Sequence, residues 1–132
     1  MTFKTAAEIA RDEHDWGTFA AVSSPADGAE RIMTVEATFL PGKSHAFHRH
    51  PNQEEVIYVL DGELEQWVEH ERRLLRAGDA VVIPAAVVHA SYNESDRPAR
   101  ILAVLSPCVG EEGYEVEDLA HEEPWRSLRD GA

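Results

Sequence analysis

Apolar and polar residues alternate with a period of two along much of the chain. Between positions 33 and 39, Met33, Val35, Ala37 and Phe39 are apolar, while the residues between them are polar or charged. This period is typical of a β-strand with one buried face, because successive side chains of a strand point to opposite faces of its sheet. The segment therefore predicts a strand that contributes one face to a hydrophobic core.

Further short strands are predicted at close intervals, with turns between them. Asp61-Gly62 is a strong hairpin signal between the strands EVIYVL and ELEQWVEH, and the segments 77–79 and 94–98 mark two more turns. The other predicted strands are SHAFHRH, RRLLR, AVVIP, VVHASYN and the almost continuously apolar ARILAVLSP. Many short strands with little helix favour an all-β sandwich or barrel.

The two ends of the chain have weaker patterns. Residues 1 to about 15 predict a short helix or an extension, with Thr5 as the N-cap of the helix. We expect one domain over residues 1–132, with a barrel core from about 30 to 107 and an acidic tail over 108–132. The pattern of the tail fits either a strand or a short helix that docks on the barrel.

Composition narrows the class of protein and its partners. The chain has 132 residues, of which 43% are hydrophobic, and this is enough for one globular core. Its formal net charge is −13, so we expect neither nucleic acid nor an anionic membrane surface as a partner. The N-terminal sequence MTFKTAAEIARDEHDW has charges and no apolar run, unlike a secretory signal, and no stretch approaches the ~20 apolar residues of a membrane span. With a single cysteine, Cys108, the chain cannot form an internal disulfide, and a cytoplasmic protein is expected.

Histidines gather just before the Asp61-Gly62 turn. His48 and His50 are two residues apart, so their side chains leave the same face of the predicted strand. His45 lies three residues before His48, and by the same rule it should face the opposite side. A pair of histidines on a strand is more often a surface or core feature than a metal site, so further ligands are needed for the metal hypothesis.

A carboxylate can complete such a site if the chain turns at 51–52 and pairs back antiparallel. Only one of the neighbours Glu54 and Glu55 can point towards the histidines. Glu55 is the better candidate, because it shares a face with Ile57 and Val59, which would line an apolar interior.

His89, in the segment VVHASYN, is a candidate for the fourth ligand. Three imidazoles and one carboxylate suit a divalent first-row metal such as Fe, Mn, Ni, Zn or Cu, whereas calcium and magnesium prefer oxygen ligands. Four protein ligands leave one or two positions of such a metal open for a substrate oxygen or O2.

The spacing of these residues resembles the two sequence motifs of the cupins. The first motif is a glycine, five residues, His-x-His, three or four residues, a glutamate, six residues and a glycine, and it is filled by Gly42, His48, His50, Glu55 and Gly62. The second is a glycine, five residues, a proline, one residue, a glycine, two residues, a histidine, three residues and an asparagine, and it is filled by Gly78, Pro84, His89 and Asn93, with Ala86 in place of the second glycine. The resemblance covers positions 42–93 and also selects Glu55.

This resemblance implies a single-domain jelly-roll β-barrel, often dimeric, with a metal held inside by His48, His50, Glu55 and His89. Small cupins similar to this chain include dioxygenases of the quercetinase type. The resemblance thus implies a metal-dependent, dioxygenase-like enzyme for a small organic substrate, in which Glu55 could also act as a general base. Two alternatives stay open: a non-catalytic sensor or storage protein that binds a metal or small ligand, and a metal-assisted isomerase or lyase for a sugar or keto acid.

Other positions bear on the pocket and on assembly. The interior positions expected to shape the pocket are Met33, Val35, Phe39, Ile57, Val59 and Gln66. Gln66 shares a face with Leu64 and Val68, where a lone polar group either orients a substrate or is a satisfied core amide. Trp67 lies on the opposite face, and together with the apolar run ILAVL it indicates a hidden surface, so a homodimer is expected.

Overall fold

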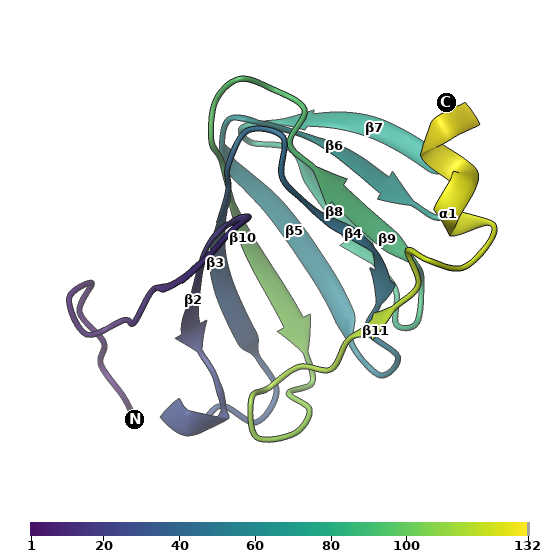
Figure 1. Ribbon diagram of the computed structural model, residues 1–132. Helices are drawn as coiled ribbons and strands as arrows, with labels where there is room; N and C mark the ends of the chain where they lie inside the picture. The colour runs from purple at the N-terminus through teal and green to yellow at the C-terminus, as the bar shows by residue number, and fades with distance from the viewer. Residues whose placement is uncertain (132) are drawn as a thin grey trace.

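The computed structural model describes residues 1–131 and consists almost entirely of two antiparallel β-sheets (Figure 1). The first sheet contains, in spatial order, β1 (Asp12–His14), β2 (Gly17–Ser23), β3 (Met33–Phe39), β10 (Ala99–Ser106), β5 (Glu54–Asp61) and β8 (Ala80–Ile83). The second contains β11 (Glu117–Asp118), β4 (Ser44–Arg49), β9 (His89–Tyr92), β6 (Glu63–Val68) and β7 (Glu71–Arg76). The predicted all-β jelly roll is confirmed.

The main core lies between the two sheets. In β3 the four apolar residues of the alternating pattern are buried and the residues between them are partly exposed, as the sequence predicted. They pack with apolar residues of β10 and β5 and, from the second sheet, with Leu64 and Leu75. Burial of these apolar surfaces is the main force that holds the two sheets together.

A second apolar cluster covers the outer face of the second sheet. It contains Phe47 of β4 and Trp67 of β6, together with Leu119 of the tail. Trp125, the first residue of the short helix α1 (Trp125–Leu128), packs against this cluster, and Figure 1 shows α1 beside β6 and β7. Trp67 is only 3% exposed, so the expectation that it presents a surface to a second copy is wrong. The chain's own tail covers it.

The tail is also held by charge. Arg129, in the 3-10 helix η2 (Arg129–Gly131), lies 2.6 Å from the buried carboxylate of Glu65 and 3.6 Å above the ring of Tyr92. Arg72 of β7 binds the same carboxylate at 2.8 Å. The tail therefore docks both as a strand, β11, and as a short helix, α1.

The N-terminal segment is an extension, and the prediction of a short helix there is wrong. The amides of Glu8 and Ile9 both donate to the carbonyl of Thr5, which makes one isolated turn. Residues 12–14 then pair with β2 as strand β1. Ile9 is the only large apolar residue between Lys4 and β1, so a helix here would have no apolar stripe to bury.

Tight turns account for two of the motif positions. Gly62 has a φ of 79°, and a Cβ atom there would lie 2.6 Å from the carbonyl oxygen of Pro98, so only glycine fits this hairpin. Ala86 has a φ of 67°, in the left-handed region that favours glycine, at the position where the motif usually has glycine.

The 3-10 helix η1 (Pro25–Asp27) precedes β3. Within residues 1–131, no helix is both long and apolar enough to cross a membrane.

Candidate metal centre

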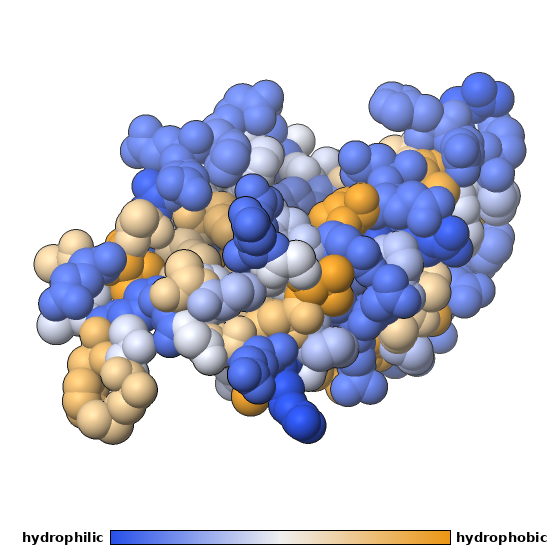
Figure 2. All heavy atoms as spheres, turned by 90° about the horizontal axis from the view of Figure 1, so that it is seen from below, coloured by the Kyte–Doolittle hydropathy of each residue, from blue (hydrophilic) through white to orange (hydrophobic). Residues whose placement is uncertain are grey.

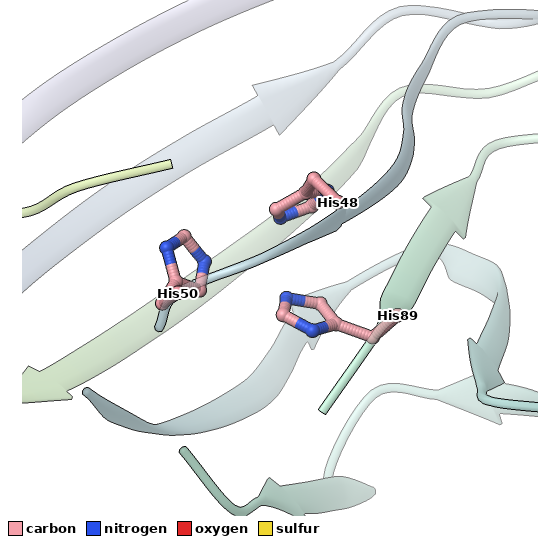
Figure 3. A group of neighbouring side chains, drawn as sticks. All are labelled: His48, His50 and His89. Carbon is pink, nitrogen blue, oxygen red and sulfur yellow. The ribbon is translucent and has the colours of Figure 1, made fainter. Parts of the chain in front are cut away.

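Three histidines converge between the sheets, where β4 pairs with β9 (Figure 3). His48 lies directly opposite His89 in the β4–β9 register, and His50 follows two residues after His48. One ligand nitrogen from each ring lies within 4.8 Å of the other two. His50 and His89 are 6% and 1% exposed. The predicted convergence of these residues is confirmed, and three buried histidines are positioned to bind a metal ion.

Backbone carbonyls fix the orientation of all three rings. The Nδ1 atoms of His48, His50 and His89 donate to the carbonyl oxygens of Ala46, Glu115 and Val87, at 2.7, 2.8 and 2.9 Å. A carbonyl oxygen only accepts, so each Nδ1 carries the ring proton. Each Nε2 then keeps its lone pair, which is the state that a metal ligand requires.

Glu55 of β5 completes the group. Its Oε1 lies 2.9 Å from Nε2 of His89 and 3.4 Å from Nε2 of His50. In a neutral ring anchored through Nδ1, the Nε2 atom is an acceptor, so Glu55 Oε1 and His89 Nε2 then face each other as two buried acceptors without a hydrogen-bond donor. A cation between them satisfies both atoms, so the donor set fits a metal ion. Glu55 is buried and Glu54 is exposed, as strand parity predicted.

Burial and the mutual contacts of these side chains shift their pKa values in different directions. Burial, reinforced by the nearby His89, lowers the pKa of His48 to about 3. Burial alone would raise the pKa of Glu55, but the neighbouring His50 and His89 outweigh it and lower this pKa to about 2. Burial also opposes the charged form of His50, yet Glu55 and the Glu115 carbonyl raise the pKa of His50. At neutral pH, Glu55 is therefore an anion and His48 a neutral imidazole, the forms that bind metal, whereas the raised pKa of His50 means that a metal has to displace a proton from its Nε2.

The group opens into a cavity of about 830 Å³ between the sheets. Its walls are mostly apolar and include Met33, Val35, Phe39 and Ile57, four of the residues expected to shape it. Val59 and Gln66, which were also expected there, do not line it. Val59 is packed into the main core, and aromatic rings of Trp16 and Phe19 complete the wall instead.

Gln66 lies behind the cavity wall. Its Oε1 accepts a hydrogen bond of 2.6 Å from the hydroxyl of Ser91, which does line the cavity, and its Nε2 donates to the carbonyl of Trp67 at 3.1 Å. Of the two roles that the sequence left open for Gln66, this geometry favours the satisfied core amide.

His45 lines the cavity on the same side as His48, which corrects the expectation that it faces away. His45 pairs with Ser91 and His48 pairs with His89, so Ala46 and Phe47 together stand opposite the single residue 90. This is a β-bulge, and its extra residue reverses the alternation of side chains between His45 and His48. The bulge depends on the pairing with β9, and the sequence of β4 alone does not show it.

Gln53 is a site-supporting residue that the sequence did not reveal. It is 1% exposed, and its Nε2 donates to the carbonyls of Pro107 and Gly113 at 2.7 and 2.9 Å. Its Oε1 accepts from the amide of Glu115 at 3.0 Å. Gln53 thus holds residues 107–115 in place, and with them the Glu115 carbonyl that orients His50.

Acidic residues surround the cavity. Asp12, Glu111, Glu112 and Asp118 are among its lining residues. Among residues 1–131, no lysine or arginine lines it. Figure 2 shows the lower end of the molecule as drawn in Figure 1, where apolar surface lies among strongly polar groups. The site therefore combines an apolar interior with a negative surround.

Comparison with known proteins agrees with the fold and the motif spacing. The Cupin domain family matches residues 35–105. Polyketide synthase CurC of Streptomyces cyaneus is 38% identical over 71 residues, which cover 54% of this chain and 46% of that protein. The chain spans about half the length of the curated relatives it matches.

Two solved structures show the extent of the similarity in fold. The polyketide cyclase RemF from Streptomyces resistomycificus superposes with a TM-score of 0.74 and 23% identity, over 98% of this chain and 93% of that one. Oxalate decarboxylase from Lactobacillus farciminis, in complex with formate, gives a TM-score of 0.75 and 23% identity, over 94% and 38% of the two chains.

Proposed function

The chain belongs to the cupin family, and from this premise we propose that it is a metal-dependent enzyme for a small, uncharged and largely apolar substrate that carries neighbouring oxygen atoms. The observation that supports this proposal most directly is the pair of facing acceptors, Glu55 Oε1 and His89 Nε2, in the wall of an apolar cavity.

The protein would hold the metal through the Nε2 atoms of His48, His50 and His89 and through a carboxylate oxygen of Glu55. When bound, a divalent Fe, Mn, Ni, Zn or Cu ion supplies Lewis acidity and open positions for substrate oxygen or O2. The chain supplies the rest of the chemistry. Apolar walls bury the carbon skeleton of the substrate and exclude water, and the ionised carboxylate of Glu55 can take a proton from a substrate hydroxyl.

The charges around the cavity support an uncharged substrate. Besides Glu55, four acidic residues line it without a lysine or arginine among residues 1–131, and the whole chain has a formal charge of −13. A carboxylate substrate such as oxalate or a keto acid would meet repulsion with no basic side chain to bind it. Flavonols, catechols and β-diketones carry neighbouring oxygens without that charge, and they suit the cavity better.

We propose a dioxygenase-type reaction as the first candidate, because three imidazoles and one carboxylate leave room for both substrate and O2. The test is protein loaded in turn with each of the five metals and screened for O2 uptake with flavonols, catechols and β-diketones. The metal-loaded wild type should consume O2 with at least one of them, and the His89→Ala variant should not. Absence of O2 uptake with every metal and substrate would reject the dioxygenase.

A cyclase is the second candidate, and the similarity to two polyketide proteins favours it. CurC is 38% identical over 71 residues, and RemF shares the fold over nearly the whole of both chains. A cyclase would rearrange a poly-β-ketone without O2, with the same cavity and the same Glu55 carboxylate as proton acceptor. Substrate loss that proceeds equally under argon and under air would identify this reaction.

A binding role without turnover is separated from both reactions by a simple measurement. A ligand that raises the melting temperature of the metal-loaded protein, and is recovered unchanged after long incubation, would support a sensor or storage protein. Chemical conversion of the same ligand would reject that role.

A further inference from the structure

His45 lines the cavity among aromatic rings and differs in its contacts from the three metal-binding histidines. The bulge in β4 brings its ring to the inner face, where it contacts two aromatic rings edge to face. Its ring centroid lies 4.3 Å from that of Trp16, with an interplanar angle of 77°, and 4.7 Å from that of Phe39, with an interplanar angle of 72°. The ring of His14 stacks on Trp16 with a centroid distance of 5.1 Å and an interplanar angle of 4°, which helps to hold the indole in place. His45 is thus fixed within a rigid aromatic wall.

The ring of His45 lacks the internal anchor that each metal-binding histidine has. His48, His50 and His89 all donate to backbone carbonyls, but no hydrogen bond within residues 1–131 engages the ring of His45. Burial lowers the pKa of His45 to about 4, so at neutral pH its ring is uncharged and offers one donor and one acceptor. The ring of His45 is half-buried and lines the cavity, so its two nitrogens are available to a ligand or to water there.

The surroundings of His45 restrict what that ligand can be. The hydroxyl of Ser91, opposite His45 in the β-ladder, already donates to Gln66. The acidic residues of the cavity disfavour an anion, and the rings of Trp16 and Phe39 favour a flat apolar partner. The ring of His45 lies 6.3 Å from that of His48, so a ligand on His45 also lies next to the metal-binding histidines.

We propose that Trp16, His45 and Phe39 form a subsite for a hydroxyl-bearing aromatic ring, whose hydroxyl hydrogen-bonds to the imidazole of His45. The subsite makes His45 a specificity-determining residue: it distinguishes a phenolic ring from an unsubstituted ring of the same shape. This inference rests on the proposed function for its biological meaning, but the binding that it predicts can be measured without turnover.

The test compares two probes of similar shape, 2-naphthol and 2-methylnaphthalene, by titration into zinc-loaded protein. The wild type should bind 2-naphthol roughly tenfold more tightly, which is the effect of one additional buried hydrogen bond. His45→Phe should remove this preference and leave the affinity for 2-methylnaphthalene within about threefold. His45→Gln, which keeps a donor and an acceptor, should retain part of the preference. His70→Phe, the same substitution at an exposed histidine outside the cavity, should change neither affinity.

Each outcome decides the inference. A preference for 2-naphthol that persists in His45→Phe would show that another group reads the hydroxyl, and it would overturn the subsite while leaving the proposed enzyme standing. Equal affinity of the wild type for both probes would overturn the subsite as well. A preference that is lost in His45→Phe establishes the subsite even if no substrate is turned over, in which case only the proposed enzyme fails.

Discussion

Each imidazole of the metal centre is held by a main-chain carbonyl, so its orientation does not depend on the other two histidines. His50 follows β4, and its ring contributes little to either apolar cluster. A single ligand can therefore be removed while the strands that surround it stay paired.

His50→Ala should weaken metal binding by more than ~100-fold, because loss of a ligand costs more than loss of a group that only supports one. The far-ultraviolet circular dichroism should keep its β-sheet signal. The measurements are metal titration of the metal-free variant and its spectrum. His121→Ala, at an exposed histidine, is the matched control and should bind metal like the wild type. A variant that does not fold would show instead that the metal is structural.

Ala86→Gly should raise the free energy of unfolding by ~0–1 kcal/mol. Alanine at a φ of 67° costs ~1–2 kcal/mol, and the greater freedom of glycine in the unfolded chain offsets part of the relief. Ala85 has no positive φ, so Ala85→Gly should instead lose ~0.5–1 kcal/mol. Denaturant unfolding of both variants checks this. Equal destabilisation of the two would contradict strain at Ala86.

The arrangement of the metal-binding group could be predicted at the residue scale because strand parity and motif spacing both depend only on sequence distance. They correctly brought together His48, His50, His89 and Glu55. His45 was misplaced because a bulge is a property of two paired strands, and one strand's sequence does not contain it. The carbonyl anchors could not be predicted either, since every residue supplies the same oxygen.

Among the elements, the segment 107–115 has the closest connection to the metal centre. It runs from the end of β10 towards β11, and a buried side chain, Gln53, binds it at three points. Its Glu115 carbonyl accepts the Nδ1 proton of His50. Stability of this segment and orientation of a metal-binding histidine are therefore coupled.

Gln53→Leu should lower the free energy of unfolding by about 2–4 kcal/mol, because two carbonyls and one amide lose a buried partner. It should also weaken metal binding by ~10–100-fold through the less ordered Glu115 carbonyl. Urea unfolding and metal titration measure the two effects. Asn52→Ala, which removes an exposed hydrogen bond to the Glu115 side chain, is the control. Lower stability with unchanged metal affinity would show that the segment does not orient His50.

Elements with a strict two-residue period could be predicted from sequence, and β3 is the clearest case. The N-terminal segment was less predictable, because Thr5 and Glu8 satisfy a capping pattern that occurs here in a single turn. A capping pattern begins a stable helix only if the helix has an apolar face to bury, and the N-terminal segment lacks one. The tail has few apolar residues, and its docking depends on Trp67 and Glu65, which lie far away in sequence.

For the whole molecule, the buried histidines make the metal-free protein sensitive to acid. Unfolded histidines take up protons near pH 6.5, whereas burial lowers the pKa of His45 to about 4 and that of His48 to about 3. The unfolded state binds more protons in that interval, so the free energy of unfolding should fall as the pH drops from 6.5 towards 4. The raised pKa of His50 acts at higher pH: its contribution to stability is complete below pH 6.5 and is lost as the pH rises through its folded pKa, so it does not change the fall between pH 6.5 and 4.

Urea midpoints of metal-free protein across this pH range measure the effect. His45→Phe should show a shallower dependence than the wild type, because one of the two lowered pKa values is removed. A stability that rises on acidification from pH 6.5 would contradict the assignment of neutral, buried imidazoles.

A homodimer stays a prediction, and the structure moves its basis from Trp67 to the outer face of the first sheet. The face contains neighbouring apolar residues of β5, β8 and β10: Val56, Tyr58, Val82, Leu102 and Val104. Tyr58 and Val82 are 43% and 64% exposed. Light scattering should give a dimer for the wild type and a monomer for Val82→Lys, whereas Leu74→Lys, on β7 of the other sheet, should stay dimeric. A monomeric wild type at high concentration would reject this interface.

The bulge in β4 links the length of this strand to the metal affinity of the protein. Ala46 is one of the two residues of the bulge, and its carbonyl accepts the Nδ1 proton of His48. A sequence one residue shorter here would still align His45 with Ser91 and His48 with His89, but it would lack the bulge that turns the carbonyl two residues before His48 towards its ring. Relatives with four rather than five residues between the motif's first glycine and its first histidine are thus expected to share the interior of this barrel and to release their ion more readily.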